Sequence, residues 1–496
     1  MELTTVCLAT VVLVVICFWF SRHDPRLPPC PVRPLPFVGH LLYLEKNPRA
    51  LFARWRQQCG EIYSLYLGRS LVVMLNGYDL VKEALVKNGD ACIDRPYSYI
   101  DAATGAEGRG ITFSSGNIWR EHKLVTVNIF RSLGVTRNIL AEKVAEIVAI
   151  NNEALASLKG APTNINNILT TSVANVICSI IIGHRFSTDD KQFIQCCEYF
   201  RSIVVDLEST NLVNFYKFLQ YLPGDMFGAK SIGRKAKFIL ENFASRFVRR
   251  KGYQEYDVNN LDNFVSLYVF EMNKKIKSGE PTTMSEENLI KTVFDLFGAG
   301  METMSTSLLW CVLYMVHYPE VQEKVYLEIE KEVGVVRLPN MSDKSRLPYM
   351  NAVIMEVQRI SSIVPLNLTR FCSKNITIGG YTVPAGTQII PSLDSILFDK
   401  KIWGDDVDSF KPERFLDEDR KVRYPEQFVP FSLGKRMCIG EAMAKMELFM
   451  FFGAMIQKFK FIAPDPAFPP PLEALFGLNV TPVPFKVRAI ERKMAA

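Results

Sequence analysis

The order of apolar and polar positions predicts a chain that is mostly helical. Apolar side chains at positions 350, 353, 354 and 357 follow the i, i+3, i+4, i+7 spacing of a helix buried on one side. Most of 78–332 has helical composition, and within it 291–317 is a long apolar stretch without proline. Residues 441–458 return to helical spacing near the C-terminus. We therefore expect helices to form most of the fold.

Strand patterns are short and few. Residues 61–68 and 70–76 are rich in β-forming side chains and are separated by a turn. Residues 376–390 alternate between apolar and polar positions with glycine and proline between the runs. No internal repeat is evident. The expected fold class is mainly α with small β-sheets, in one large unit.

The long apolar segment contains the triplet Gly298-Ala299-Gly300. Glycine weakens a helix, but its missing side chain lets another group approach the backbone closely. Glycines inside a long helix therefore suggest that a ligand lies against it.

Near the N-terminus, Leu3 to Phe20 form an apolar stretch of eighteen residues without a charge. This length is close to the roughly 20 residues needed to cross a bilayer core. A cleaved signal peptide fits less well, because a basic segment before it and a small-residue cleavage site after it are both missing. Arg22, Arg26 and Arg33 follow it, so the positive-inside tendency places the bulk of the protein in the cytosol, at the endoplasmic reticulum.

A proline-rich segment follows the predicted anchor. Five prolines between positions 28 and 36 favour an extended, stiff spacer. We expect residues 1–21 to form the membrane anchor, 22–39 a hinge and 40–496 the catalytic domain.

Composition and charge exclude several classes of protein. The chain has 496 residues, 48% of them hydrophobic, and a formal net charge of +6 from interspersed charges, without the basic arms or stripes of a nucleic-acid binder. Its eleven cysteines include no CxxC pair, which argues against a zinc site and a disulfide framework. Most are expected to be reduced, buried thiols.

The segment Phe431 to Gly440, with the sequence FSLGKRMCIG, carries the most specific chemistry. A cysteine thiolate that binds iron needs N–H donors and a nearby positive charge to lower its pKa. Two glycines let the backbone fold tightly around the sulfur of Cys438. A helix starting at Cys438 would also direct its positive end at the thiolate.

This segment resembles the FxxGxRxCxG haem-binding signature of the cytochrome P-450 family at all five fixed positions. The resemblance implies a triangular, mostly helical domain that holds haem b, with Cys438 as the axial ligand of the iron. The cofactor-binding positions it implies here are Phe431, Gly434, Arg436, Cys438 and Gly440.

Two further segments resemble the same family in the same order. Glu356-Val-Gln-Arg359 is similar to its ExxR pair, and Phe410 to Phe415 resembles a later segment that supplies Arg414. By itself such a pair is a common helix-surface ion pair. In the family context, Glu356, Arg359 and Arg414 are expected to form a buried structural network that fixes the cysteine loop.

The stretch Ala299-Gly-Met-Glu302-Thr303 is similar to the AGxET oxygen-activation stretch of the family. Cleavage of dioxygen requires two protons, and an acid beside a hydroxyl can relay them through water. Glu302 and Thr303 are therefore the expected catalytic residues, with Ala299 against the haem. In the alternative interpretation, Thr303 bonds back to its own helix and Glu302 faces solvent.

The resemblance also supplies the remaining site positions. Trp119 to Lys123 resembles a WxxxR propionate contact, with lysine in place of the usual arginine. Arg95 and Arg370 align with further propionate-binding positions. The substrate pocket implied by the resemblance includes Phe113, Phe297, Val364, Phe476 and Leu478.

The family resemblance implies a microsomal monooxygenase acting on a fatty acid, steroid or foreign compound. Because no flavin or nicotinamide fingerprint is evident, electrons would come from NADPH-cytochrome reductase, with cytochrome b5 as a further candidate partner. A haem-thiolate isomerase or dehydratase of lipid peroxides, and a haem-binding sensor without turnover, are the alternatives. The intact Glu302-Thr303 pair favours the monooxygenase.

Overall fold

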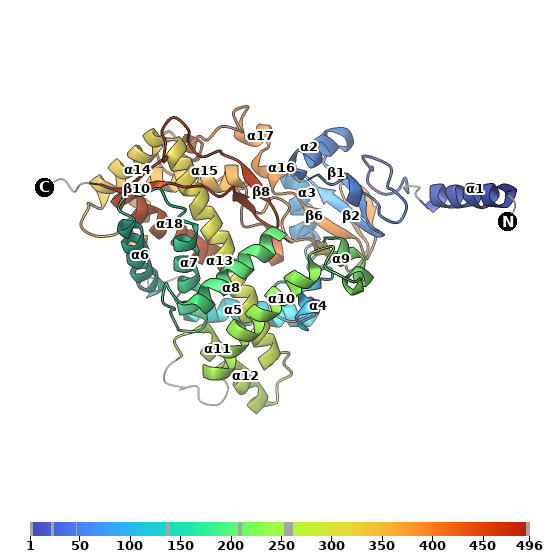
Figure 1. The fold of residues 1–496 in the computed structure, drawn as a ribbon, viewed down its shortest axis with the longest axis horizontal. Helices are drawn as coiled ribbons and strands as arrows, with labels where there is room; N and C mark the ends of the chain where they lie inside the picture. Colours follow the sequence, from blue (N-terminus) through green and yellow to red (C-terminus); the bar gives the residue numbers. More distant parts are fainter. Residues whose placement is uncertain are drawn as a thin grey trace.

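The computed structural model describes residues 3–20, 24–45, 47–134, 139–206, 211–251 and 261–492 (Figure 1). Its helices are α1 (Leu3–Phe20), α2 (Pro48–Cys59), α3 (Tyr78–Lys82), α4 (Tyr99–Ala103), α5 (Gly116–Ser132), α6 (Ile139–Ser157), α7 (Asn166–Ile181), α8 (Lys191–Asp206), α9 (Asn211–Phe215), α10 (Ala229–Ile239), α11 (Arg246–Lys251), α12 (Phe264–Ser278), α13 (Glu286–His317), α14 (Pro319–Glu332), α15 (Pro348–Ser361), α16 (Asp394–Leu397), α17 (Lys400–Trp403) and α18 (Glu441–Lys458). Its strands are β1 (Ile62–Leu67), β2 (Ser70–Leu75), β3 (Arg370–Phe371), β4 (Ile376–Ile378), β5 (Tyr381–Val383), β6 (Gln388–Pro391), β7 (Phe459–Ile462), β8 (Ala474–Phe476), β9 (Val480–Pro482) and β10 (Arg488–Glu491).

The predicted mainly α fold with small β-sheets is confirmed, and the long periodic segments are found where they were expected. The 350–357 pattern lies within α15, the 441–458 pattern coincides with α18, and the 376–390 region supplies three short strands. The largest sheet has four strands in the order β1-β2-β6-β3, and the other described sheets have two strands each. In Figure 1 this sheet lies at one side of the body and the long helices fill the rest.

Helix α13 forms the centre of the helical part. Its N-terminus is capped by Ser285, whose side chain accepts a hydrogen bond from the Asn288 backbone N–H, and two glutamates occupy its first turn. Among the described residues, α13 has the length and apolar composition of a membrane span, but 78% of its most apolar stretch is buried within the protein. It is therefore a core helix.

The two glycines of α13 admit other helices. A Cβ at Gly298 would overlap the ring of Phe200 on α8, and a Cβ at Gly300 would overlap Ile177 on α7. The sequence correctly predicted a close approach at this triplet. At the glycines themselves the approaching groups are protein side chains, and only Ala299 between them is exposed.

The N-terminal helix α1 lies outside the body of the protein in Figure 1. Several of its valines and leucines, such as Leu8 and Val14, are exposed. Met1, Glu2 and 21–23, which include Arg22 and the end of the predicted anchor, lie outside the described residues.

The proline-rich segment is attached to the sheet along its second half. The backbone N–H of Ser64 in β1 donates to the carbonyl of Pro29 at 2.9 Å, and the Ser64 hydroxyl donates to Pro28 at 2.8 Å. Farther along, the buried His40 ring lies 2.9 Å from the Val32 carbonyl. From Pro28 onward, contact with β1 therefore adds to the stiffness that proline confers.

Candidate functional site

The Cys438 loop is held by its own backbone. The N–H of Cys438 donates to the carbonyl of Phe431 at 3.0 Å, and a 3-10 turn over Gly434–Arg436 precedes it. Helix α18 begins at Glu441, with Gly440 as its N-cap, so the helix starts three residues later than the start considered at Cys438. The N-terminal end of α18 nevertheless follows directly from the cysteine.

The thiol of Cys438 has accessible surface although protein surrounds it. Burial raises its pKa, while a hydrogen bond with the backbone of Gly440 lowers the pKa by a smaller amount. The side chain is therefore accessible although it is partly desolvated. Coordination to a metal ion would deprotonate this thiol.

Three arginines from distant parts of the chain converge near this loop. Arg95 donates to the carbonyls of Leu368 and Thr369, each at 2.7 Å. Arg436 donates to the carbonyl of Ile93 at 2.7 Å and to that of Ile111 at 3.0 Å. We call Arg95, Arg370 and Arg436 the arginine cradle.

The cradle is electrostatically unfavourable on its own. Burial, and secondarily the charge of Arg370, lower the pKa of Arg436 to about 9, and burial lowers that of Arg370 to about 10. Arg370 is 1% exposed, and its Nε and Nη1 atoms have no hydrogen-bond partner among the described residues. Such a cluster is suited to an anionic ligand.

Trp119 and Lys123 of α5 complete the same region. The Arg436 guanidinium lies 4.1 Å from the centroid of the Trp119 ring, a cation–π distance. The Lys123 ammonium donates to the carbonyl of Lys435 and lies 5.2 Å from the Trp119 ring. Lys123 thus contacts the cysteine loop itself.

The middle of α13 presents the predicted catalytic pair. Thr303 is partly exposed, and its hydroxyl donates to the Ala299 carbonyl at 2.7 Å, as the alternative interpretation expected for this residue. Glu302 differs from that interpretation, because it is 2% exposed and does not face solvent. The Thr303 oxygen retains its lone pairs as acceptors while the back-bond fixes its rotamer.

Glu302 has the electrostatics of a proton donor. Burial raises its pKa to about 7, opposed by the charge of Arg201 and a hydrogen bond with Thr306. Its Oε2 atom finds no partner within the described part of the chain. This carboxyl group can therefore hold or release a proton near neutral pH.

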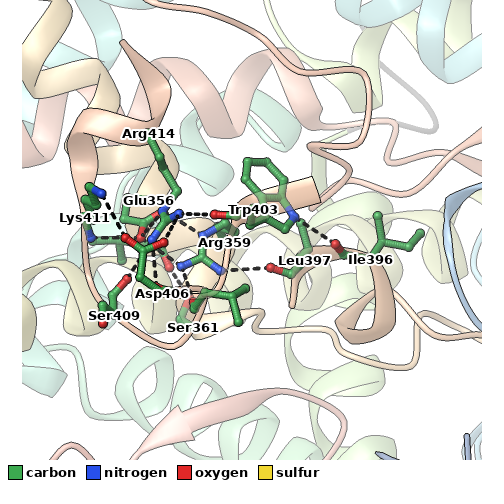
Figure 2. A network of polar contacts seen from close by, with 12 residues as sticks. Glu356, Arg359, Ser361, Ile396, Leu397, Trp403, Asp406, Ser409, Lys411 and Arg414 are labelled. Atoms are coloured by element: carbon green, nitrogen blue, oxygen red, sulfur yellow. Dashed lines mark hydrogen bonds and ion pairs between the residues drawn. The ribbon is translucent and has the colours of Figure 1, made fainter. Parts of the chain in front are cut away.

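Figure 2 shows a polar network around Glu356, Arg359 and Arg414. Glu356 accepts hydrogen bonds from Arg359 at 2.7 and 2.9 Å and from Arg414 at 3.0 Å. Arg359 also donates to the carbonyls of Leu397 and Val407. Glu356 and Arg359 are fully buried, and the structure brings together all three residues that the sequence grouped.

Comparison with known proteins identifies the family. Residues 28–489 match the cytochrome P450 family. The chain belongs to the cytochrome P450 family. The chain is 35% identical to "Cytochrome P450 2U1" of Homo sapiens over 96% of its length and 91% of that protein. It is 33% identical to "Cytochrome P450 2D10" of Mus musculus, over 99% and 98% of the two chains, and 36% identical to "Cytochrome P450 2C3" of Oryctolagus cuniculus, over 92% and 91%.

Membership makes the chain a haem-thiolate monooxygenase, as predicted. Its residues fit the haem of a cytochrome P450, because the unpartnered nitrogens of Arg370 lie in a cationic cradle suited to propionate groups. Ala299 and Cys438, both predicted to contact the haem, are exposed. The family match includes the second half of the expected hinge, in agreement with the docking of Pro28 on the sheet.

The predicted pocket residues of this cytochrome P450 differ in exposure. Phe113, Val364 and Phe476 are partly exposed, and Leu478 is exposed. Phe297 is instead fully buried, with its ring 4.2 Å from that of Phe243 and 5.7 Å from that of Phe200. It therefore lies behind the wall, where it supports the packing of α13.

A second buried ion cluster, which the sequence patterns did not predict, involves the N-terminal part of α13. Lys291 binds Asp295 and also lies 3.2 Å from Asp101 of α4. Asp295 accepts hydrogen bonds from the backbone of Ile111 and Thr112, at 2.9 and 3.0 Å. In the sequence, Lys291 and Asp295 are charged residues four positions apart in an apolar segment, and this spacing could have indicated the cluster.

Proposed function

We propose that this cytochrome P450 is a microsomal enzyme that inserts one oxygen atom of O2 into a lipophilic substrate. The electrons would come from NADPH through a separate reductase in the same membrane. The observation that carries the proposal is the buried carboxyl group of Glu302, with a pKa of about 7, beside Thr303 and the exposed Ala299. A haem-thiolate isomerase would need no proton donor at this place.

Cys438 would hold the haem through its thiolate, and the haem would supply the redox chemistry that activates dioxygen. Arg95, Arg370 and Arg436 would bind the propionates, with Trp119 and Lys123 bracing the cradle. Arg370 would give its two unpartnered nitrogens to these anions. Gly434 and Gly440 would let the backbone fold beneath the sulfur.

Two of the chain's own residues, Glu302 and Thr303, would move the proton. Glu302 would hold the proton at its carboxyl oxygen, and the Thr303 hydroxyl would accept and pass it through ordered water. Breaking the back-bond from Thr303 to Ala299 would free the hydroxyl hydrogen for this step. Burial of Glu302 keeps bulk water from bypassing the path.

The residues that the family resemblance assigns to the pocket support a lipophilic substrate. Phe113, Val364, Phe476 and Leu478 all retain exposed apolar area. Fatty acids, steroids and many foreign compounds have the apolar surface that such a pocket would bind.

The N-terminal helix supports a membrane location. Leu3–Phe20 has no charged residue, and its exposed apolar side chains lie outside the body of the protein. Residues 1–21 would be the anchor, 22–39 the connection and 40–496 the catalytic domain. NADPH-cytochrome reductase, with cytochrome b5 as a further candidate, would dock from the cytosol.

A carbon-monoxide difference spectrum of the reduced protein is the first test. A strongly red-shifted Soret band that is lost in Cys438→His supports thiolate ligation. A band typical of histidine-ligated haem in the unaltered protein would refute it.

Turnover separates the candidate functions. With reductase and a panel of fatty acids, steroids and foreign compounds, substrate-dependent NADPH consumption with oxygenated product supports the monooxygenase. Conversion of lipid peroxides without reductase would instead favour the isomerase. Haem binding without any turnover would favour the sensor.

Orientation can be tested through the glycosylation motifs that begin at Asn340, Asn367, Asn375 and Asn479. A cytosolic domain leaves all four unmodified in microsomes. Glycan on any of them would overturn the proposed orientation.

A further inference from the structure

Two backbone segments that lead into the arginine cradle run antiparallel to each other. The N–H of Phe371 donates to the carbonyl of Asp94 at 2.8 Å, and the N–H of Ser373 donates to the carbonyl of Ala91 at 2.9 Å. Only Cys372 lies between the two donor residues, whereas Cys92 and Ile93 lie between the two acceptor residues. This two-against-one arrangement is a β-bulge.

Cysteines occupy both sides of the bulge. Cys372 stands alone opposite Cys92 and Ile93. The N–H of Cys372 points away, toward the carbonyl of Thr387 at 2.9 Å, so its pairing with the 92–93 side is of the non-hydrogen-bonded kind. Residues paired in this way have Cα atoms about 4.5 Å apart, and a disulfide accepts Cα separations from about 4.4 Å.

The two thiols are in contact and shielded from bulk water. Cys92 and Cys372 are buried in one hydrophobic cluster with β2 and β6. Hydrogen bonding between the two thiols raises the pKa of Cys92 and lowers that of Cys372. The Cys372 thiol also donates to the carbonyl of Lys374 at 3.0 Å. Burial also raises the pKa of Cys178, a thiol elsewhere in the core.

We propose that Cys92 and Cys372 are a redox-active dithiol, which two-electron oxidants such as hydrogen peroxide convert into a disulfide. Each thiol loses its proton and one electron, the S–S bond forms, and peroxide is reduced to two molecules of water. A reducing cytosol keeps the pair in the dithiol form.

The disulfide would clamp the arginine cradle. Arg370 lies two residues before Cys372, and the carbonyl of Ile93, next to Cys92, accepts the hydrogen bond of Arg436 at 2.7 Å. A covalent bond here joins the two segments that position these guanidinium groups. Oxidation therefore restrains the cradle without touching Cys438.

The test is peptide mapping of the holoprotein after treatment with diamide, a diazene that takes up the two electrons and two protons of a dithiol. Remaining thiols are alkylated after denaturation. We expect a peptide pair joined through Cys92 and Cys372 and a fall in alkylated cysteines from eleven to nine, that is 11 − 2, reversed by dithiothreitol. Haem transfer to apomyoglobin should become slower in the oxidised protein.

Variants supply the controls. Cys92→Ala and Cys372→Ala should each abolish the cross-link, and Cys178→Ala should retain it. Full alkylation of both cysteines in the treated wild-type protein, or pairing of either with another cysteine, would overturn the dithiol, even if the variants fail to fold. An unchanged rate of haem transfer after cross-linking would overturn the clamp.

Discussion

The carbonyl oxygen of Leu85 occupies the position that a side chain on Gly434 would need. A Cβ added to Gly434 would overlap this oxygen, and Gly434 has a φ of 74°, in the left-handed region. The turn before Cys438 therefore packs directly on the backbone of a π-helical segment, Glu83–Lys87. Glycine is required here both for conformation and for space.

Gly434→Ala should prevent normal haem incorporation, because the added methyl group must displace the Leu85 backbone or the cysteine loop. The measurement is the carbon-monoxide spectrum per mole of protein. Gly386→Ala is the matched control, since Gly386 has a φ of 86° but no described atom within 4 Å of an added Cβ. It should cost about 1–2 kcal/mol of stability from the backbone alone and retain the spectrum. Equal losses in both variants would refute the steric argument.

Glu356→Ala should destabilise the fold strongly. It leaves the guanidinium groups of Arg359 and Arg414 without their shared carboxylate, and breaking a buried ion pair costs about 3–5 kcal/mol. Urea unfolding of the purified protein measures the loss. Asp419→Ala, which removes an ion pair with both partners exposed, should change stability by less than about 1 kcal/mol. A similar, small effect of both substitutions would contradict the structural role of the network.

Arg370→Met should have opposite effects on the apoprotein and the holoprotein. Without haem, Arg370 is a buried charge whose Nε and Nη1 lack a partner in the described structure, so an apolar side chain of similar length should stabilise the fold. With haem, the variant loses a propionate contact and should release haem faster. Thermal unfolding of the apoprotein and haem transfer to apomyoglobin test the two parts. Faster haem loss together with a less stable apoprotein would indicate a general packing defect instead.

Glu302→Gln should lower the amount of product formed per NADPH consumed, because the amide cannot donate the proton. In the unaltered enzyme this yield should fall as pH rises through about 7, since the raised pKa leaves Glu302 protonated only below that range. The variant should show a low yield that no longer follows this pH dependence. Substrate-binding spectra provide the control, because binding of a neutral substrate should remain. A persisting pH dependence in the variant would assign the titration to another group.

Local sequence patterns predicted most of the regular elements for a physical reason. Helices such as α15 and α18 bury one face, and burial imposes a period that the sequence displays. The cysteine loop was predictable because several unusual residues occur at fixed spacing.

Contacts between backbone segments that are far apart in the sequence do not produce a recognisable sequence pattern. The carbonyls of Ile93 and Ile111 bind Arg436 whatever their side chains are, so residue identity could not reveal them. The burial of Phe297 was missed because a phenylalanine can either line a cavity or fill a core. The role of the glycines in α13 depended on which helix crosses there, which is a property of the tertiary fold.

Glu447 provides a test of the core away from the site. This side chain of α18 is fully buried, and neither carboxyl oxygen has a partner among the residues that the structure describes. Burial raises its pKa from 4.5 to about 8. Because the folded-state pKa is the higher one, the stability associated with the neutral form is complete below about pH 4.5 and is lost as pH rises through 8.

Glu447→Gln should therefore raise the free energy of unfolding at pH 8.5, by up to several kcal/mol at roughly 1.4 kcal/mol for each unit of pKa shift. The gain should shrink steadily as the pH is lowered toward 5, where the native carboxyl group is already neutral. Denaturant unfolding at a series of pH values measures both. Glu441→Gln, at a partly exposed position six residues earlier in the same helix, serves as the comparison variant. A pH-independent difference for Glu447→Gln would mean that this carboxyl group is solvated or paired in the folded protein, since only a buried, unpartnered acid links stability to pH in this direction.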